Sequence, residues 1–155
     1  MATARANLPH EDRTVDEPRH NEIHPVVLSE IEQVNDDIKL FKLSILNKEK
    51  GVKFHPGQWL DVLIPTLPKA GGFTLTSTPT QALPSPTNPN PYLELAIQRS
   101  SNPPAKWLWQ APSQILHSQL FVRVGGSFVW PPVDVDVGEG GIERVVFVAG
   151  GVGIK

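Results

Sequence analysis

Hydrophobic and polar residues alternate along several short stretches of the chain, as in strands that bury one face. Most of these stretches end near glycine, proline or asparagine, which are typical of turns. The predicted strands are residues 26–32, 38–46, 59–64, 73–77, 92–99 and 118–124. Six short strands in this order predict a mostly β fold, a small antiparallel Greek-key barrel.

One short helix interrupts the strand pattern. Asn102 is placed to cap it, Pro103 stands at the first helical position, and Pro112 should end it after Leu108.

The last apolar stretch of the chain differs from the six before it. Residues 144–149 (RVVFVA) are almost wholly apolar, as in a parallel strand that is buried on both faces. We therefore expect a disordered tail over residues 1–23, the barrel over residues 24–132, and a linker with the first strand of an α/β domain over residues 133–155.

Composition excludes several classes of function. The chain of 155 residues has 14 basic and 16 acidic residues, so we expect no broad attraction to nucleic acid. It has no cysteine, which excludes disulfides and thiolate metal sites, and its five histidines share no metal-ligand spacing. No apolar run is long enough for a membrane span. The first residues contain acids and no apolar core, which argues against a secretory signal or a mitochondrial presequence.

The most informative tract for chemistry surrounds Phe73. Phe73 is followed by Thr74, and Ser77 lies three residues further on, so one strand can offer an aromatic ring beside hydroxyl groups. A flavin needs a flat apolar contact and polar partners at its edge. A core phenylalanine with threonines that favour strands would look the same, so the tract alone leaves both interpretations open.

Two glycine turns follow in order. Gly125 and Gly126 precede Phe128 after the sixth predicted strand, although a bulge or hairpin with a core phenylalanine would fit as well. A second turn directly after residues 144–149 contains Gly150, Gly151 and Gly153. Glycines after a buried strand permit a close approach of a nucleotide pyrophosphate.

The order and spacing of these motifs over residues 24–154 resemble the ferredoxin–NADP reductase family, and most closely the oxidoreductase NAD-binding domain-containing proteins. The resemblance implies a barrel that binds a flavin, FAD or alternatively FMN, and a second domain that binds NAD(P)H. In such proteins the nicotinamide passes hydride to flavin N5, and the reduced flavin passes electrons onward, for example to a protein acceptor. The resemblance also suggests a mitochondrial protein, whereas the N-terminus taken at face value suggests the cytoplasm.

The resemblance also implies roles for single residues. Phe73 would pack on the isoalloxazine ring, Thr74 would approach flavin N5, and Ser77 would be the second hydroxyl of the motif. Gly71 stands where the family has an arginine that pairs with the flavin phosphate, and a glycine supplies no cation. Arg99, from the next strand, is a candidate to replace it. The N-terminus of the helix expected between Pro103 and Leu108 is another, because it offers backbone N–H groups and a favourable dipole to an anion.

Since the sequence stops at Lys155, just after the second glycine turn, we expect a truncated nucleotide-binding domain. NAD(P)H would then bind only if the missing domain were present, and hydride transfer would be impaired. Whether this chain alone is an enzyme is left open. The alternative interpretations are a cofactor-free β-barrel that binds another protein, and an inactive gene fragment.

Overall fold

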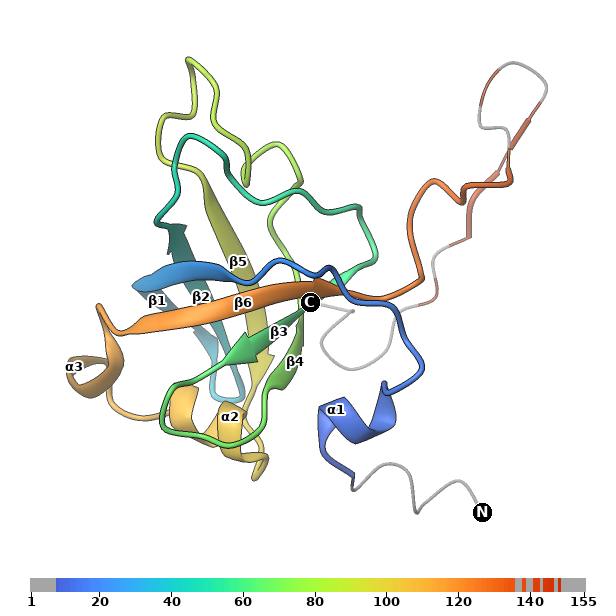
Figure 1. Ribbon diagram of the computed structural model, residues 1–155. Coiled ribbons are helices and arrows are strands. Elements are labelled where there is room, and N and C mark those ends of the chain that lie inside the picture. The colour runs from blue at the N-terminus through green and yellow to red at the C-terminus, as the bar shows by residue number, and fades with distance from the viewer. Residues whose placement is uncertain (1–7, 136–137, 139–140, 143, 147, 149–155) are drawn as a thin grey trace.

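The computed structural model describes residues 8–135, 138, 141–142, 144–146 and 148, and one antiparallel sheet forms its centre (Figure 1). The strands are β1 (His24–Asn35), β2 (Ile38–Ile45), β3 (Trp59–Leu63), β4 (Gly71–Thr74), β5 (Tyr92–Gln98) and β6 (Gln119–Gly125). Their order in the sheet is β4-β3-β6-β1-β2-β5, so β4 and β5 are its two edges. Each strand overlaps a predicted one, which confirms the predicted six-stranded antiparallel fold.

The two edge strands approach each other without forming a continuous ladder. One antiparallel bridge joins Leu75 to Leu95, and Thr76 N donates a hydrogen bond of 2.8 Å to Glu94 O. The Ser77 hydroxyl accepts a hydrogen bond of 3.0 Å from Glu94 N. The sheet therefore curls into a barrel that is not closed along the line between β4 and β5.

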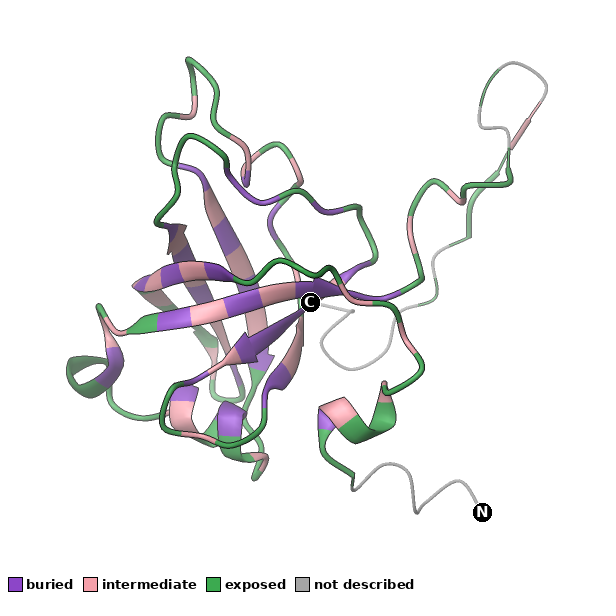
Figure 2. Ribbon diagram, viewed as in Figure 1, coloured by how far each residue is buried: buried purple, intermediate pink, exposed green. Residues whose placement is uncertain are grey.

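The alternation of side chains decides which face of each strand lies inside. Every second residue is buried along β5 and, from Phe41 onwards, along β2, and Figure 2 shows this banding along the ribbon. Phe41, Leu43 and Leu93 are fully buried in the core. Burial of each such side chain stabilises the fold by about 1.5–3 kcal/mol. The β1–β2 turn is fixed locally, because the Asn35 side chain accepts a hydrogen bond of 2.9 Å from Asp37 N.

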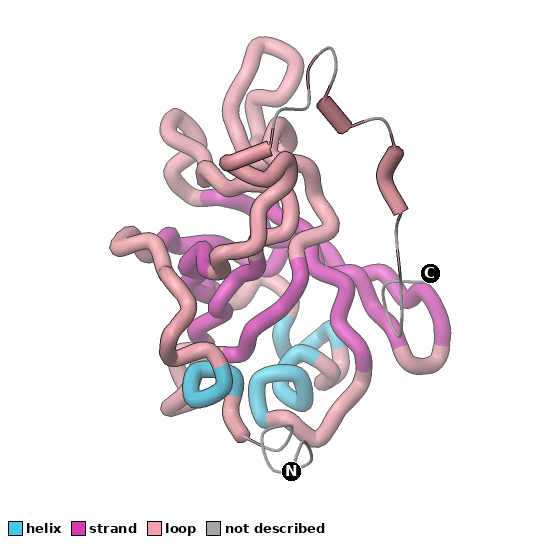
Figure 3. The backbone as a smooth tube through the Cα atoms, turned by 90° about the vertical axis from the view of Figure 1, so that its right-hand side faces the viewer, coloured by secondary structure: helices cyan, strands magenta, loops and turns pink. Residues whose placement is uncertain are grey.

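The three helices in the described part of the chain are short and gather at one end of the barrel (Figure 3). They are α1 (His10–Arg13), α2 (Pro103–Leu108) and α3 (Pro112–Ile115). The α2 helix confirms the predicted one, although the Asn102 side chain makes no capping hydrogen bond. Pro112 does more than end α2, since it begins α3 at the position where a proline is tolerated.

Residues 8–20, which we call the N-terminal arm, differ from the disordered tail expected for residues 1–23. The arm contains α1 and then runs along β6, where His20 N donates to Val124 O and Gly126 N donates to Pro18 O, both at 2.9 Å. The sequence shows no apolar periodicity here because charged and polar groups, rather than an apolar face, bind the arm to the barrel.

Beyond β6 the predicted strand at residues 144–149 does not appear in the part that the structure describes. Residues 144–146 and 148 have no strand assignment, and Val146 and Val148 are 85% and 94% exposed. A strand of this kind needs neighbouring strands on both sides, and none lies beside these four residues. Gly150, Gly151 and Gly153 lie outside the described residues. Among the helices described, none has the length and apolar character needed to cross a membrane.

Candidate functional site

Strand β4 places its residues on two faces of the sheet. Phe73 pairs with Leu60 across the ladder and lies partly buried against the core, whereas Thr74 pairs with Trp59 on the outer face and is exposed. Trp59 pairs in turn with Gly125 on β6. The register therefore places Thr74 and Gly125, two predicted flavin contacts, on either side of Trp59.

The geometry around Gly71 explains why no arginine stands there. A Cβ atom at this position would lie 2.6 Å from the Phe73 ring and 2.6 Å from Pro104 Cβ. Both distances are far inside van der Waals contact, so a longer side chain requires that Phe73 and α2 move. The position that the Phe73 ring occupies therefore excludes a phosphate-binding arginine at residue 71.

Two other predicted contacts have roles of their own in this structure. Ser77 is buried, and its hydroxyl accepts the Glu94 amide hydrogen bond that joins the edges of the barrel. The Arg99 guanidinium stacks on the Trp109 ring, 4.6 Å from its centroid. Arg99 does not line the pocket described below. Its binding to a flavin phosphate stays a prediction.

The first glycine turn makes room for an aromatic ring. Gly126 has φ +105°, and a Cβ atom there would overlap the Trp59 indole, so glycine is required on both counts. Phe128 is 68% exposed and packs on Gly57 rather than in the core. These residues shape the surface beside Thr74, and their contact with a flavin stays a prediction.

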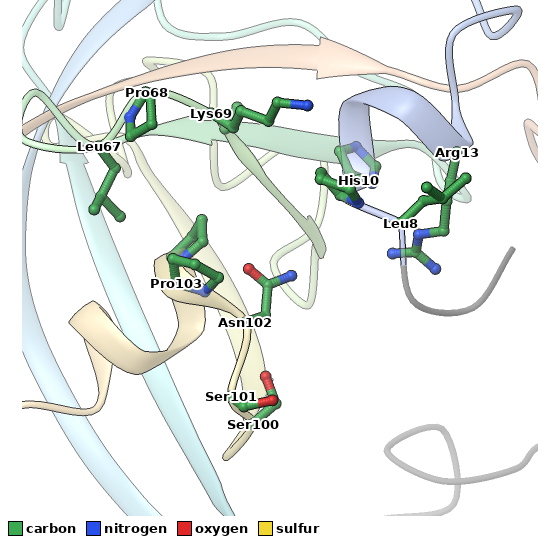
Figure 4. Close-up of a pocket in the computed structure, with 13 residues that line it drawn as sticks. Leu8, His10, Arg13, Leu67, Pro68, Lys69, Ser100, Ser101, Asn102 and Pro103 are labelled. Carbon is green, nitrogen blue, oxygen red and sulfur yellow. The ribbon is translucent and has the colours of Figure 1, made fainter. Parts of the chain in front are cut away.

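A pocket of about 590 Å³ lies at the start of β4. Its walls come from three segments that are distant in the sequence: the N-terminal arm, the β3–β4 loop at residues 67–70, and residues 100–104, which are the β5–α2 loop and the first two residues of α2. Figure 4 shows the arm on one side and the β5–α2 loop on the other. The pocket could not be predicted from the sequence, because nothing in the sequence shows that the arm folds back on the barrel.

Among the residues that the structure describes, the ionisable side chains that line the pocket are all of the basic types. They are His10, Arg13 and Lys69, and no aspartate or glutamate is among the lining residues. The β5–α2 loop adds polar side chains at residues 100–102, namely two serines and an asparagine. The pocket therefore suits an anionic ligand with hydrogen-bond acceptors. No group of three metal-ligating side chains occurs anywhere in the described residues.

A buried carboxylate holds the arm to the barrel beside this pocket. Asp61 on β3 is fully buried, and its Oδ1 atom lies 2.9 Å from His10 Nε2. Its Oδ2 atom accepts hydrogen bonds from Arg19 Nε at 2.7 Å and from Arg123 Nη2 at 2.9 Å. We call these four residues the Asp61 cluster. The one signal in the sequence is a lone acid between the apolar residues of a strand, which must find a partner.

The partners of Asp61 control its ionisation. Burial raises the pKa of this carboxyl group, but the hydrogen bonds from His10, Arg19 and Arg123 together lower it more, so its pKa lies well below the ordinary value. The unfolded chain then binds the proton more readily than the folded chain. Asp61 therefore stabilises the fold at neutral pH, and this contribution declines as the pH falls through the range below about 5.

We predict a measurable acid sensitivity from this one residue. In urea unfolding at a series of pH values between 7 and 3, the free energy of unfolding of the wild type should fall more steeply towards low pH than that of Asp61→Asn. Asparagine cannot titrate, so the difference between the two curves isolates this carboxyl group. Parallel curves for the two proteins would contradict the assignment.

Comparison with known proteins gives consistent matches. The chain is 35% identical over 153 residues to a Xenopus tropicalis protein named oxidoreductase NAD-binding domain-containing protein 1, covering 99% of this chain and 45% of that protein. A protein of the same name from Danio rerio is 31% identical, and the match covers 99% of this chain and 52% of that protein. The Homo sapiens protein is 33% identical, and the match covers 73% of this chain and 33% of that protein. The chain thus spans about half, or less, of the length of these relatives. No protein-family model matches it.

Solved structures agree on the fold. A ferredoxin reductase in carbazole 1,9a-dioxygenase matches 74% of this chain and 32% of its own, with a TM-score of 0.56 and 18% identity. The same reductase described as its FAD apo form matches 66% of this chain and 29% of its own, with a TM-score of 0.50 and 18% identity.

Proposed function

Because the chain is a homologue of the oxidoreductase NAD-binding domain-containing proteins and has the fold of a ferredoxin reductase domain, we propose that it binds a flavin, FAD in the first place, as part of an oxidoreductase. The flavin would carry the electrons. The chain's own residues would bind and orient it and keep water from one of its faces.

The observation that carries this proposal is the position of the pocket. It begins at Ala70, next to the first residue of β4, and the exposed Thr74 lies four residues further along the same strand. At about 3.3 Å per residue, this separation is about 13 Å. An elongated ligand can therefore place an anionic end in the basic pocket and a polar ring edge beside the Thr74 hydroxyl.

The test is retention of the cofactor. Purified chain incubated with FAD and then desalted should keep a yellow flavin with a perturbed visible spectrum. Thr74→Val keeps the shape of the side chain and removes the hydroxyl, so we expect affinity to fall by about threefold to tenfold, as for one hydrogen bond. Thr87→Val, in the proline-rich loop between β4 and β5, is the matched control and should not change it. A folded but colourless wild type would contradict the proposal and favour a cofactor-free interaction domain.

We further propose NAD(P)H as the electron source, which the name of the relatives supports, and a protein as the electron acceptor, which the likeness to a ferredoxin reductase supports. Hydride transfer needs the nicotinamide held against the flavin ring. The described residues form the barrel and the arm, without an α/β domain that could hold it. The 155-residue chain loaded with FAD should therefore oxidise NADH little faster than free FAD does. Rapid oxidation by this chain alone would contradict that expectation.

A further inference from the structure

The arginines of the arm and barrel have assigned partners with one exception. Arg19 and Arg123 bind Asp61, and Arg99 stacks on Trp109. Within residues 8–135, all of which the structure describes, Arg13 is the one arginine with neither a carboxylate nor a ring partner. Its side chain is exposed and lines the pocket, so its charge is available to a ligand.

The other cation of the pocket is already partly neutralised. Lys69 Nζ lies 2.6 Å from the Asp12 carboxylate, and in Figure 4 its amino group points towards α1. Asp12 does not line the pocket itself. Arg13 is therefore the strongest uncompensated charge at this site.

The polar groups across the pocket are also without protein partners. The side chains of Ser100, Ser101 and Asn102 make no hydrogen bond to any described residue, although all three line the pocket. Two hydroxyl groups and one amide group can each donate a hydrogen bond. Together with a guanidinium, they match the several acceptor oxygens of a phosphate ester.

We propose that Arg13, supplied by the N-terminal arm, binds the phosphate or pyrophosphate of the flavin and takes the place of the cation that strand β4 lacks at Gly71. This inference rests on the proposed function. It assigns to the arm a part of the binding site that the barrel cannot provide, because Phe73 and Pro104 fill the space at residue 71.

The Asp61 cluster positions Arg13. The His10 ring, three residues before Arg13, lies directly over Gly72, where any Cβ atom would overlap it, and its Nε2 atom is 2.9 Å from Asp61. On the other side of Arg13, Arg19 Nε donates to Asp61 at 2.7 Å. Both ends of the segment that contains Arg13 are thus fixed to one buried carboxylate. Both glycines at the start of β4 leave space for a ring. Gly71 leaves space for Phe73, and Gly72 leaves space for His10.

The experiment compares ligands that differ in their phosphates. Wild type, Arg13→Gln and Arg13→Lys are titrated with FAD, FMN, riboflavin and ADP, and binding is followed by calorimetry. We expect Arg13→Gln to weaken FAD and FMN by about tenfold or more and to leave riboflavin, which has no phosphate, unchanged. Lysine should restore part of the affinity, because it keeps the charge and loses the bidentate geometry. Lys106→Gln, on α2 and outside the pocket, is the matched control, and Arg99→Ala tests the competing cation.

The results distinguish a failure of the Arg13 proposal from a failure of the proposed flavin binding. If wild type binds FAD and Arg13→Gln binds it equally well, the role of Arg13 is wrong and flavin binding stands. An equal loss for riboflavin would also overturn it, because Arg13 would then act on the fold or the ring. If wild type binds no flavin, the proposed function fails; ADP binding that Arg13→Gln weakens would still support a phosphate site here. No binding of ADP or of any flavin would overturn both.

Discussion

Asp61→Asn should unfold at a markedly lower urea concentration than the wild type, with a loss of about 3 kcal/mol in the free energy of unfolding at pH 7. The substitution keeps the size of the side chain but leaves two guanidinium groups without their anion. The side chains of Arg19 and Arg123 are 15% and 28% exposed, so partial hydration places the loss at the lower end of the range for buried pairs. Equilibrium unfolding followed by tryptophan fluorescence measures it.

A matched control removes another carboxylate of the same arm. Asp12 pairs with Lys69 at 2.6 Å, but both side chains are about half exposed. Asp12→Asn should therefore cost less than about 1 kcal/mol. Equal losses for the two variants would show that burial of Asp61 is not what makes the cluster strong.

Gly72→Ala should release the arm from the barrel. The new Cβ atom would occupy the space of the His10 ring, so α1 must move away and the hydrogen bond between His10 and Asp61 is lost. We expect a loss of about 2 kcal/mol in the free energy of unfolding, together with faster proteolysis within residues 8–20. Urea unfolding and limited proteolysis of the folded protein measure the two effects.

A double-mutant cycle shows whether His10 is the cause. His10→Ala removes the ring, so Gly72→Ala should cost much less in that background than in the wild type. Additive losses would mean that the alanine acts through the strand itself, and the packing of His10 on Gly72 would not explain it.

The barrel was predictable because its determinants are local. Residues 41–45 alternate between apolar and polar side chains, and residues 92–98 carry a large buried apolar side chain at every second position, so the pattern fixes both the strand and its buried face. The α2 helix could be predicted equally well, since Pro103 marks its first turn. Phe73 and Thr74 were predicted as neighbours on one strand, and the ladder adds that they lie on opposite faces.

The arm was not predictable because the contacts that fix it are distant and few. His10 and Arg19 meet Asp61 across 51 and 42 residues of sequence, and no periodic pattern connects them. A single acid in an apolar strand indicates that partners exist, but it does not say which cations supply them. The pocket depends on the same fold-back, so Arg13 could not be recognised as a site residue from the sequence.

The most direct test of flavin binding at the barrel is an amide NMR spectrum of the labelled chain, recorded with and without FAD. We expect saturable shifts at the N-terminal arm, at residues 67–74 and at the β5–α2 loop, with little change at the β1–β2 turn. Saturable shifts confined to another face, or none at FAD concentrations well above the protein concentration, would contradict it.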